Sequence, residues 1–161
     1  MQRRTSGSSP KKTRTAAKKT GDKPLSAEQY RQLLAGIELK DISLEKCSAN
    51  VDRTKIAGPL DVNVSWKSSY AKLPENKFAI LNDYELAAST KPKNDVPLRI
   101  TGTFKLVYSS ANQPTREFLQ KFAVRNSTFN SWPYFRELIQ SIIQRMNLPL
   151  LVLPLLKMPA E

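Results

Sequence analysis

The stretch NSWPYFRELIQSIIQRMNLPLLVLPLL, residues 130–156, decides the fold class because it joins an amphipathic helix to an apolar extended segment. Pro133 is tolerated in the first turn of such a helix, where its missing N–H leaves no bond unmade, and Ser131 stands at the capping position. The pair of Leu148 and Pro149 ends the helix. The segment LPLLVLPLLK then holds seven Leu or Val side chains. We expect these side chains either to cover the core of the domain or to lie in an interface with another chain. The helix itself is recognised from apolar side chains recurring every three or four residues: Phe135, Leu138, Ile139, Ile142, Ile143 and Met146.

Four segments upstream of this helix have the alternating apolar pattern of β-strands: residues 37–45, 60–66, 78–88 and 96–110. The first of them changes parity between Lys40 and Asp41, which predicts a bulge or a bend. The connections AKLPEN and STKPKND are short and contain Pro, Asn and Asp, as turns do. Consecutive strands with hairpin-length links predict a four-stranded antiparallel sheet. With the helical layer that follows, the fold class is α+β.

Two shorter helices are also predicted. Residues 25–36 contain a helix in which Ser26 is the cap and Gln29 its capping-box partner, and Gly36 ends it. Residues 114–127 contain a second helix with Thr115 as the cap. The polar residues 126–130 predict a break before the last helix.

Charge divides the chain into two parts. The net charge is +12, and residues 1–24 hold eight Lys or Arg against one acid, Asp22, with almost no apolar side chains. Such a segment cannot bury enough surface to offset the entropy of ordering it. We therefore predict a disordered basic tail over residues 1–24 and one folded domain over residues 25–161. No segment reaches the roughly 18 apolar residues that span a bilayer, and the single Cys47 fits a reducing cytoplasm.

The sequence offers no set of residues suited to catalysis. It has no histidine, which removes histidine-based triads and histidine-ligated metal sites. Its five glycines are isolated from one another, so no phosphate-binding loop is present. We therefore predict that the chain is not an enzyme and uses no metal or other cofactor.

Two stretches resemble the bacterial protein-export chaperone SecB. KDISLE, residues 40–45, is similar to the first-strand motif of that family, and the stretch from residue 132 onward is similar to its helix and the Pro-Leu segment after it. The resemblance covers roughly residues 26–157. A second C-terminal helix has no counterpart here, and SecB is typically acidic, so the chain resembles the SecB-like relatives, some of which serve toxin–antitoxin systems. The residues that carry the helix motif are Trp132, Pro133, Tyr134, Arg136 and Glu137.

This resemblance implies an activity and an assembly. A SecB-like protein is expected to be an ATP-independent holdase of the bacterial cytoplasm, which binds unfolded preproteins or an antitoxin and keeps them soluble and competent for export or folding. Its expected partners are those client polypeptides, with either the translocase motor SecA or an antitoxin. A homotetramer, formed as a dimer of dimers without membrane insertion, is also expected. One helix face would then form the oligomer interface, with intramolecular core as the alternative: Phe135, Ile139, Ile142, Ile143 and Met146.

A holdase needs an exposed apolar surface, preferably beside a sheet edge whose main chain can pair with a client. The candidate client-binding residues are Leu44, Trp66, Phe78 and Tyr84. Each of them can instead be core, Leu44 and Phe78 above all. A function from a different class also stays open, a nucleic-acid-associated adaptor whose basic tail, residues 1–24, contacts phosphates.

Overall fold

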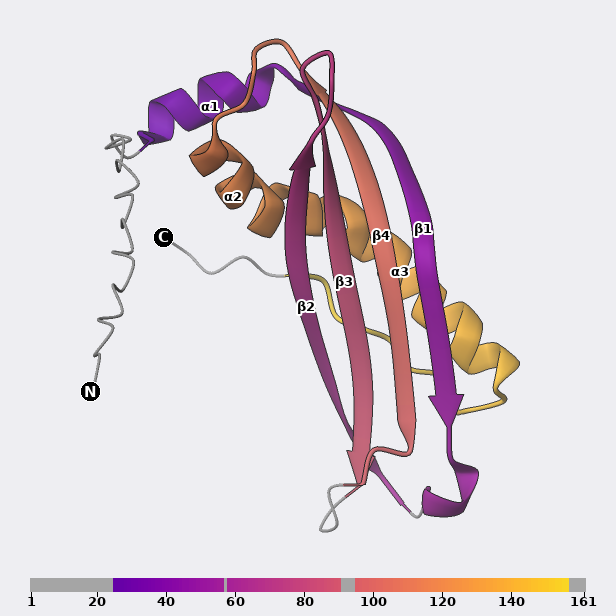
Figure 1. Cartoon of the computed structure of the whole chain (residues 1–161). Helices are drawn as coiled ribbons and strands as arrows, with labels where there is room; N and C mark the ends of the chain where they lie inside the picture. The colour runs from indigo at the N-terminus through magenta and orange to yellow at the C-terminus, as the bar shows by residue number, and fades with distance from the viewer. Residues whose placement is uncertain (1–24, 57, 91–94, 157–161) are drawn as a thin grey trace, which may run out of the picture.

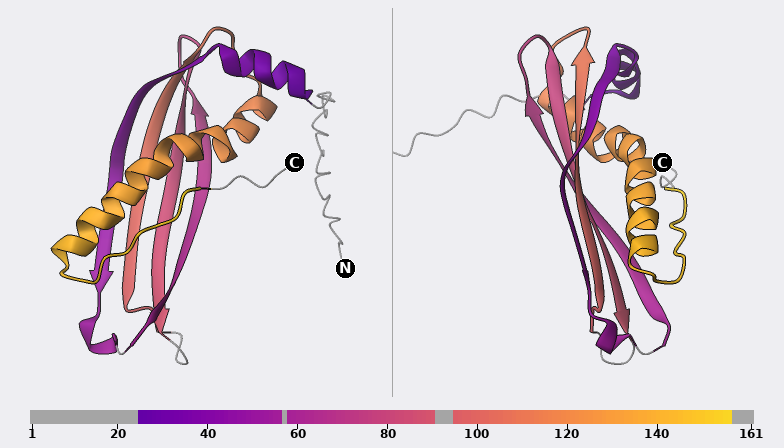
Figure 2. Two further views of the ribbon diagram at one scale, coloured as in Figure 1. Left: turned by 180° about the vertical axis from the view of Figure 1, so that it is seen from behind. Right: turned by 90° about the vertical axis from the view of Figure 1, so that its right-hand side faces the viewer.

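The computed structural model describes residues 25–56, 58–90 and 95–156, and it shows one antiparallel sheet with helices packed on one of its faces (Figure 1, Figure 2). The strand order is β1-β4-β3-β2, so β1 and β2 are the two edges. This confirms the predicted four-stranded α+β fold. The predicted tail, residues 1–24, lies outside the described residues. The elements are α1 (Ala27–Ala35), β1 (Ile37–Val51), the 3-10 turn η1 (Arg53–Lys55), β2 (Leu60–Lys72), β3 (Lys77–Thr90), β4 (Leu98–Ser110), α2 (Arg116–Val124) and α3 (Asn126–Arg145).

Strand β1 is longer and more irregular than its sequence pattern predicts. Its register against β4 shifts between Leu39 and Asp41, which confirms the predicted bulge, and shifts again between Leu44 and Lys46. The strand then continues through polar residues to Val51, which pairs with Leu98. Pairing with a well-formed neighbour extends the strand beyond the point where apolar alternation stops, because the ladder bonds do not depend on side-chain polarity.

The core lies between the helices and the inner faces of β3 and β4, where every second side chain is buried. Aromatic rings fill much of it: Phe78 stacks on Tyr108 with centroids 5.2 Å apart, and Tyr84 stacks on Phe135 at 4.6 Å. Gly102 lets α3 approach β4, because a Cβ atom there would lie 3.0 Å from Leu138 Cδ2. The sheet is therefore covered most tightly where α3 crosses it.

Helix α3 begins earlier than the sequence predicts. The predicted break at residues 126–130 is wrong: α2 ends at Val124, and α3 runs from Asn126, so Pro133 lies inside the helix and not in its first turn. The polar residues tolerate the helix because their hydroxyls bond carbonyls one turn back. Ser127 Oγ donates to Ala123 O at 2.6 Å, and Ser131 Oγ donates to Ser127 O at 3.0 Å.

The same hydroxyls join α3 to β3 through a buried polar network. Asn82 Nδ2 donates to Ser127 Oγ at 3.1 Å and to Ser131 Oγ at 2.8 Å. Ser131 Oγ also lies 2.7 Å from the Tyr84 hydroxyl, and burial raises the pKa of Tyr84 to about 12. The four polar side chains satisfy one another inside the core, so they fix the position of the helix along the strand.

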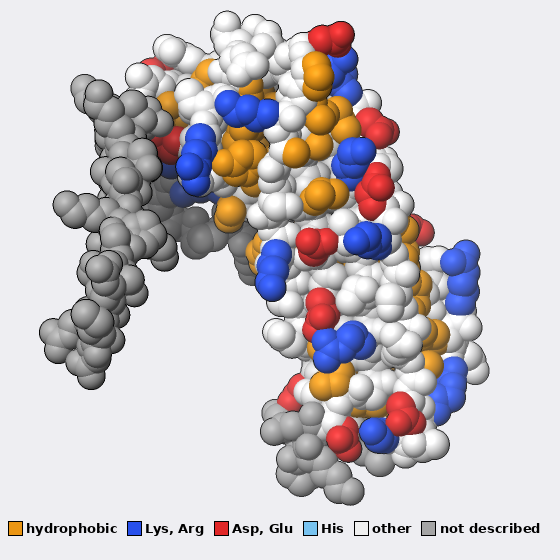
Figure 3. All heavy atoms as spheres, viewed as in Figure 1, with side chains coloured by type: hydrophobic (Ala, Val, Ile, Leu, Met, Phe, Trp, Pro, Cys, Tyr) orange, Lys and Arg blue, Asp and Glu red, His pale blue; other side chains and the backbone are white. Residues whose placement is uncertain are grey.

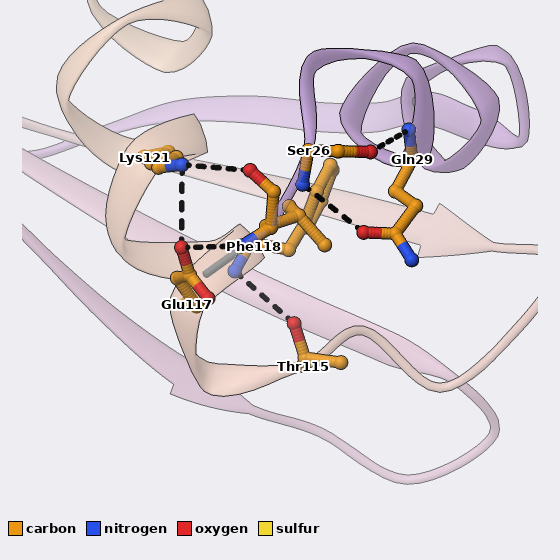
Figure 4. Close-up of polar contacts among 7 residues, drawn as sticks. Ser26, Gln29, Thr115, Glu117, Phe118 and Lys121 are labelled. Atoms are coloured by element: carbon orange, nitrogen blue, oxygen red, sulfur yellow. Dashed lines mark hydrogen bonds and ion pairs between the residues drawn. The ribbon is translucent and has the colours of Figure 1, made fainter. Parts of the chain in front are cut away.

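Helix α1 packs against α2 at the start of the folded domain. Ser26 and Gln29 form the predicted capping box (Figure 4). The backbone of Leu25 is held from both sides, because its N–H donates to Glu117 Oε1 at 2.9 Å and its carbonyl accepts from Lys121 Nζ at 3.3 Å. The backbone hydrogen bond from Leu25 is the main cause that lowers the pKa of Glu117. This double contact fixes where the chain enters the domain.

Candidate functional site

The segment after α3, residues 148–156, is extended and lies beside α3 on the helical side of the sheet; we call it the strap (Figure 2). Two side chains of the helix motif hold its backbone: Trp132 Nε1 donates to Pro154 O and Arg136 Nε donates to Leu153 O, both at 3.0 Å. The Leu153 side chain is only 4% exposed and belongs to the core cluster. The strap is therefore attached through its inner side.

The outer side of the strap is apolar and open to solvent. Leu150, Val152 and Leu155 are 69%, 59% and 71% exposed. The apolar surplus noted in the sequence is thus divided, with one set of side chains against the core and the other set on the surface. Exposed apolar stripes of this kind mark interaction sites.

An apolar groove runs between the strap and strand β2. One part is a hollow of about 340 Å³ whose walls are Val62, Val64, Trp66, Trp132 and the strap residues 151–156. A second hollow of about 300 Å³ shares Val62 and Leu151 with the first and continues toward the end of α3. No charged side chain lines either hollow in the described part of the chain.

The opposite face of the sheet has a different character. Lys, Arg, Asp and Glu side chains are interspersed over it, and hydrophobic side chains gather only in its upper part (Figure 3). Arg99 forms an ion pair with Glu85 there, and Lys105 lies 3.9 Å from Glu45. The apolar groove is therefore confined to the face that carries the helices and the strap.

Of the four predicted client-binding residues, only Trp66 lines the groove. It is 40% exposed, and its ring lies 6.2 Å from the ring of Trp132. Leu44 is 45% exposed, so it is not core, but it lies on β1 at the other edge of the sheet. Phe78 and Tyr84 are buried, with 0% and 2% exposure, so their placement on an exposed surface is corrected. Alternation identifies the inner face of a strand, but it does not show which part of that face a helix covers.

The predicted interface face of α3 is mostly core. Phe135, Ile139 and Ile143 are at most 1% exposed because they pack against the sheet of their own chain, so they cannot also form a surface between chains. Ile142 and Met146 are half-buried and stay available. The helical repeat correctly marks a buried stripe, but it does not distinguish a covering sheet from a partner chain.

Sequence reasoning missed Val62, Val64 and the individual strap residues as parts of one surface. The alternation of β2 contains the signal for its inner face, but no local pattern shows that β2 is an edge strand beside the strap. In the described ranges, no group of three or more His, Cys, Asp or Glu side chains is placed to hold a metal ion. No helix of those ranges combines the length and apolarity required to cross a membrane.

Comparisons with known proteins agree with this architecture. No protein-family model and no curated protein sequence matches the chain. Among solved structures, it is similar to the Mycobacterium tuberculosis SecB-like chaperone Rv1957, solved in complex with a ChAD peptide from the Rv1956 HigA1 antitoxin. The TM-score is 0.68 and the identity 21%, over 79% of this chain and 95% of that chain. The chain therefore has the SecB-like fold.

A second solved structure is a protein of unknown function from Streptococcus agalactiae, with a TM-score of 0.44 and 8% identity over 73% of this chain and 96% of that chain. That similarity is too low to bear on function.

Proposed function

We propose that this chain is an ATP-independent holdase that binds unfolded polypeptides in the groove between β2 and the strap. The observation that carries the proposal is the uncharged apolar groove, with Trp66 on one wall and Leu155 on the other. Unfolded chains expose apolar side chains that a folded protein would bury. A groove that offers area, with few fixed polar groups, can accept many such sequences.

The energetics fit weak, adaptable binding. Each large apolar side chain removed from water contributes about 1.5–3 kcal/mol, so a few contacts along a client give useful affinity after the ordering costs are met. Val62, Trp66 and the outer strap residues are already well exposed in the free chain. A bound client would remove these side chains from water, and the resulting favourable free energy is absent in the free chain.

The SecB-like fold supports a chaperone role and suggests the kind of client. The structural neighbour Rv1957 was solved with a peptide from an antitoxin, so an antitoxin or a preprotein is the client class that we propose here. Action in the bacterial cytoplasm, assembly to a tetramer through surfaces that include Ile142 and Met146, and contact with the motor SecA belong to the same proposal. Leu44 is a further client contact only if a client extends around to β1.

The test is suppression of client aggregation without nucleotide. The wild-type chain should slow aggregation of a chemically denatured model protein on dilution, and Trp66→Ser and Leu155→Ser should weaken that effect. Leu81→Ser is the matched control, because Leu81 is 37% exposed but lies on the other face of the sheet. An equal effect of all three substitutions would contradict the groove.

A deletion separates the holdase from the nucleic-acid adaptor. Removal of residues 1–22 takes away most of the basic segment and leaves the Leu25 backbone contacts to α2 in place. A holdase should keep its effect on aggregation after this deletion. Loss of aggregation suppression together with loss of nucleic-acid binding would favour the adaptor.

A further inference from the structure

We propose that a hollow between α1 and α2 is a binding site for the phosphate groups of a polyphosphate anion. The site is separate from the groove beside the strap and does not depend on the holdase function. Its walls are positively charged, are held by hydrogen bonds, and lie where the chain enters the domain.

The hollow has a volume of about 320 Å³, which is large enough for a small anion. Three of its wall residues are cationic: Arg31 from α1, Lys121 from α2, and Arg125 at the end of α2. Among the described residues, no Asp or Glu lines it. The two hollows of the groove have no charged wall residue in the same described ranges. This hollow therefore attracts a different kind of ligand, one with negative charge.

The ammonium group of Lys121 is fixed at the side of the hollow. It donates to the Leu25 carbonyl at 3.3 Å and forms an ion pair with Glu117 Oε1 at 3.2 Å (Figure 4). A lysine ammonium has three N–H donors, so one donor remains for a ligand. Because the protein already sets the position of this group, little conformational entropy is lost when it binds.

Arg31 contributes a guanidinium that can turn toward a ligand. Its ion pair with Glu28 spans 3.9 Å, and the two side chains are 78% and 70% exposed. An exposed pair of this kind contributes little to stability, so a bound phosphate can replace it at low cost. The planar guanidinium of an arginine donates two parallel hydrogen bonds to a phosphate, which makes Arg31 suited to this ligand.

Arg125 supplies the third positive charge, and Tyr30 forms an uncharged wall beside it. The Tyr30 ring packs against Phe118 with centroids 5.2 Å apart, and its hydroxyl donates to Asn126 Oδ1, which joins α1 to the start of α3. Burial raises the pKa of Tyr30, and the charge of Arg125 opposes that rise. The Arg125 charge is therefore felt at the wall of the hollow, and the cations from two helices are held around it.

The surroundings favour a ligand with several phosphates. Leu25 lines the hollow, and the residues that precede it in the sequence, 1–24, contain eight Lys or Arg against one acid. A chain of phosphates bound in the hollow would thus lie next to the point at which a strongly basic segment joins the domain, and both would neutralise its charge. The ligand class is a polyphosphate anion, either the backbone of a nucleic acid or a free polyphosphate.

The test is isothermal titration calorimetry of the full chain with pyrophosphate at low ionic strength. Arg31→Gln and Arg125→Gln should each weaken binding at least about fivefold, because each removes charge-assisted hydrogen bonds. Arg145→Gln is the matched control, since Arg145 is an exposed arginine at the other end of α3, about 30 Å away along the helix. It should change the affinity less than about twofold, because a distant charge is screened.

An equal effect of the three substitutions would show only a general attraction to a basic protein and would overturn the site. Unfolding temperatures are measured alongside. Arg31→Gln alters a highly exposed side chain, so it decides the test alone if Arg125→Gln does not fold. The absence of pyrophosphate binding by the wild-type chain would also overturn the site.

Citrate is the control for the ligand, because it carries a similar charge at neutral pH on carboxylates. A phosphate concentrates its charge on one tetrahedral centre that several cations can contact from different sides. Citrate should therefore bind at least about fivefold more weakly than pyrophosphate. Equal binding of the two anions would overturn the assignment to phosphate.

Two further ligands distinguish the sources of phosphate. A short oligothymidylate with a free 5′-hydroxyl presents only phosphodiesters, whereas tripolyphosphate presents terminal phosphates. Each is titrated into the wild type, Arg31→Gln and Arg145→Gln. The source is the ligand whose binding falls more in Arg31→Gln than in Arg145→Gln, and a larger fall for both supports the site with either source. A larger fall for neither ligand would overturn the proposal.

Discussion

The indole Nε1 of Trp132 donates a hydrogen bond to the carbonyl oxygen of Pro154 at 3.0 Å, and so joins α3 directly to the strap. Trp132 is also in ring contact with Trp66 across the groove, with centroids 6.2 Å apart. One side chain thus holds one wall of the groove and touches the other.

Trp132→Phe should therefore loosen the strap. The substitution keeps an aromatic ring but removes the donor and some contact area, which should cost about 1–3 kcal/mol in the free energy of unfolding. Hydrogen exchange measured by mass spectrometry should become faster in residues 150–156 and change little in β4. Tyr134→Phe on the exposed side of the same helix is the control, and an unchanged strap in Trp132→Phe would contradict the role of this bond.

Trp66 and Phe78 should respond differently to substitution by serine. Phe78 is fully buried, so Phe78→Ser should lower the free energy of unfolding by about 3–5 kcal/mol. Trp66→Ser, at a half-open position, should cost much less stability and weaken client binding more. Denaturant unfolding and the aggregation-suppression assay on both variants give the comparison. A loss of stability in Trp66→Ser as large as that in Phe78→Ser would show that Trp66 is part of the hydrophobic core and not a client-binding residue.

Asn82→Ala should destabilise the junction of β3 and α3. Asn82 is fully buried and donates to two serine hydroxyls, each of which would lose one of its hydrogen bonds. The expected cost is about 1–3 kcal/mol, measured by chemical denaturation. Asn63→Ala, at an exposed position of β2, should have little effect. Similar costs for the two substitutions would show that the network does not fix α3.

Stability should fall in strongly alkaline solution. Burial raises the pKa of Tyr84 to about 12, and burial with a smaller influence from Tyr84 raises that of Tyr108 to about 12, against about 10 in the unfolded chain. Above pH 10 the unfolded chain releases these protons and the folded chain keeps them, so unfolding becomes more favourable as pH rises toward 12. This stabilising contribution is fully present below pH 10.

Ultraviolet absorbance of ionised tyrosine checks this prediction. Tyr84 and Tyr108 should titrate last, after Tyr30, whose pKa burial also raises. The unfolding temperature should fall over the same pH range, and Tyr108→Phe should remove one of the two latest steps. Simultaneous titration of all tyrosines near pH 10, with the fold retained, would contradict the burial-based shift.

The sequence was sufficient to predict what depends on neighbours along the chain. The strands, the bulge at Leu39 and Asp41, and the caps at Ser26 and Thr115 follow from alternation and local hydrogen bonding, and the structure confirms them. The predicted start of α3 was wrong because the polar residues of its first turns are stabilised by Asn82 and Tyr84, which lie more than 40 positions away in the sequence.

The groove could be predicted only in part. The surplus apolar character of the strap was visible in the sequence. Trp66 is 40% exposed and lines the groove, and its role in client binding stays a prediction. Tyr84 lies on the same face of the sheet, yet it is buried because α3 crosses β3 directly above it. Whether an inward-facing side chain is covered depends on where one helix crosses the sheet, and that is set by tertiary packing.

The two prolines of the strap have a consequence for the colloidal behaviour of the protein. An extended segment with exposed Leu150, Val152 and Leu155 is rich in the side chains that drive cross-β self-association. Pro149 and Pro154 interrupt the donor row that stacking of straps from several molecules would need. Pro149 precedes the stripe and Pro154 interrupts it between Val152 and Leu155, so both act as gatekeepers against strand stacking. Stacking of the exposed strap from several molecules into fibres is therefore disfavoured, although its apolar side chains stay on the surface.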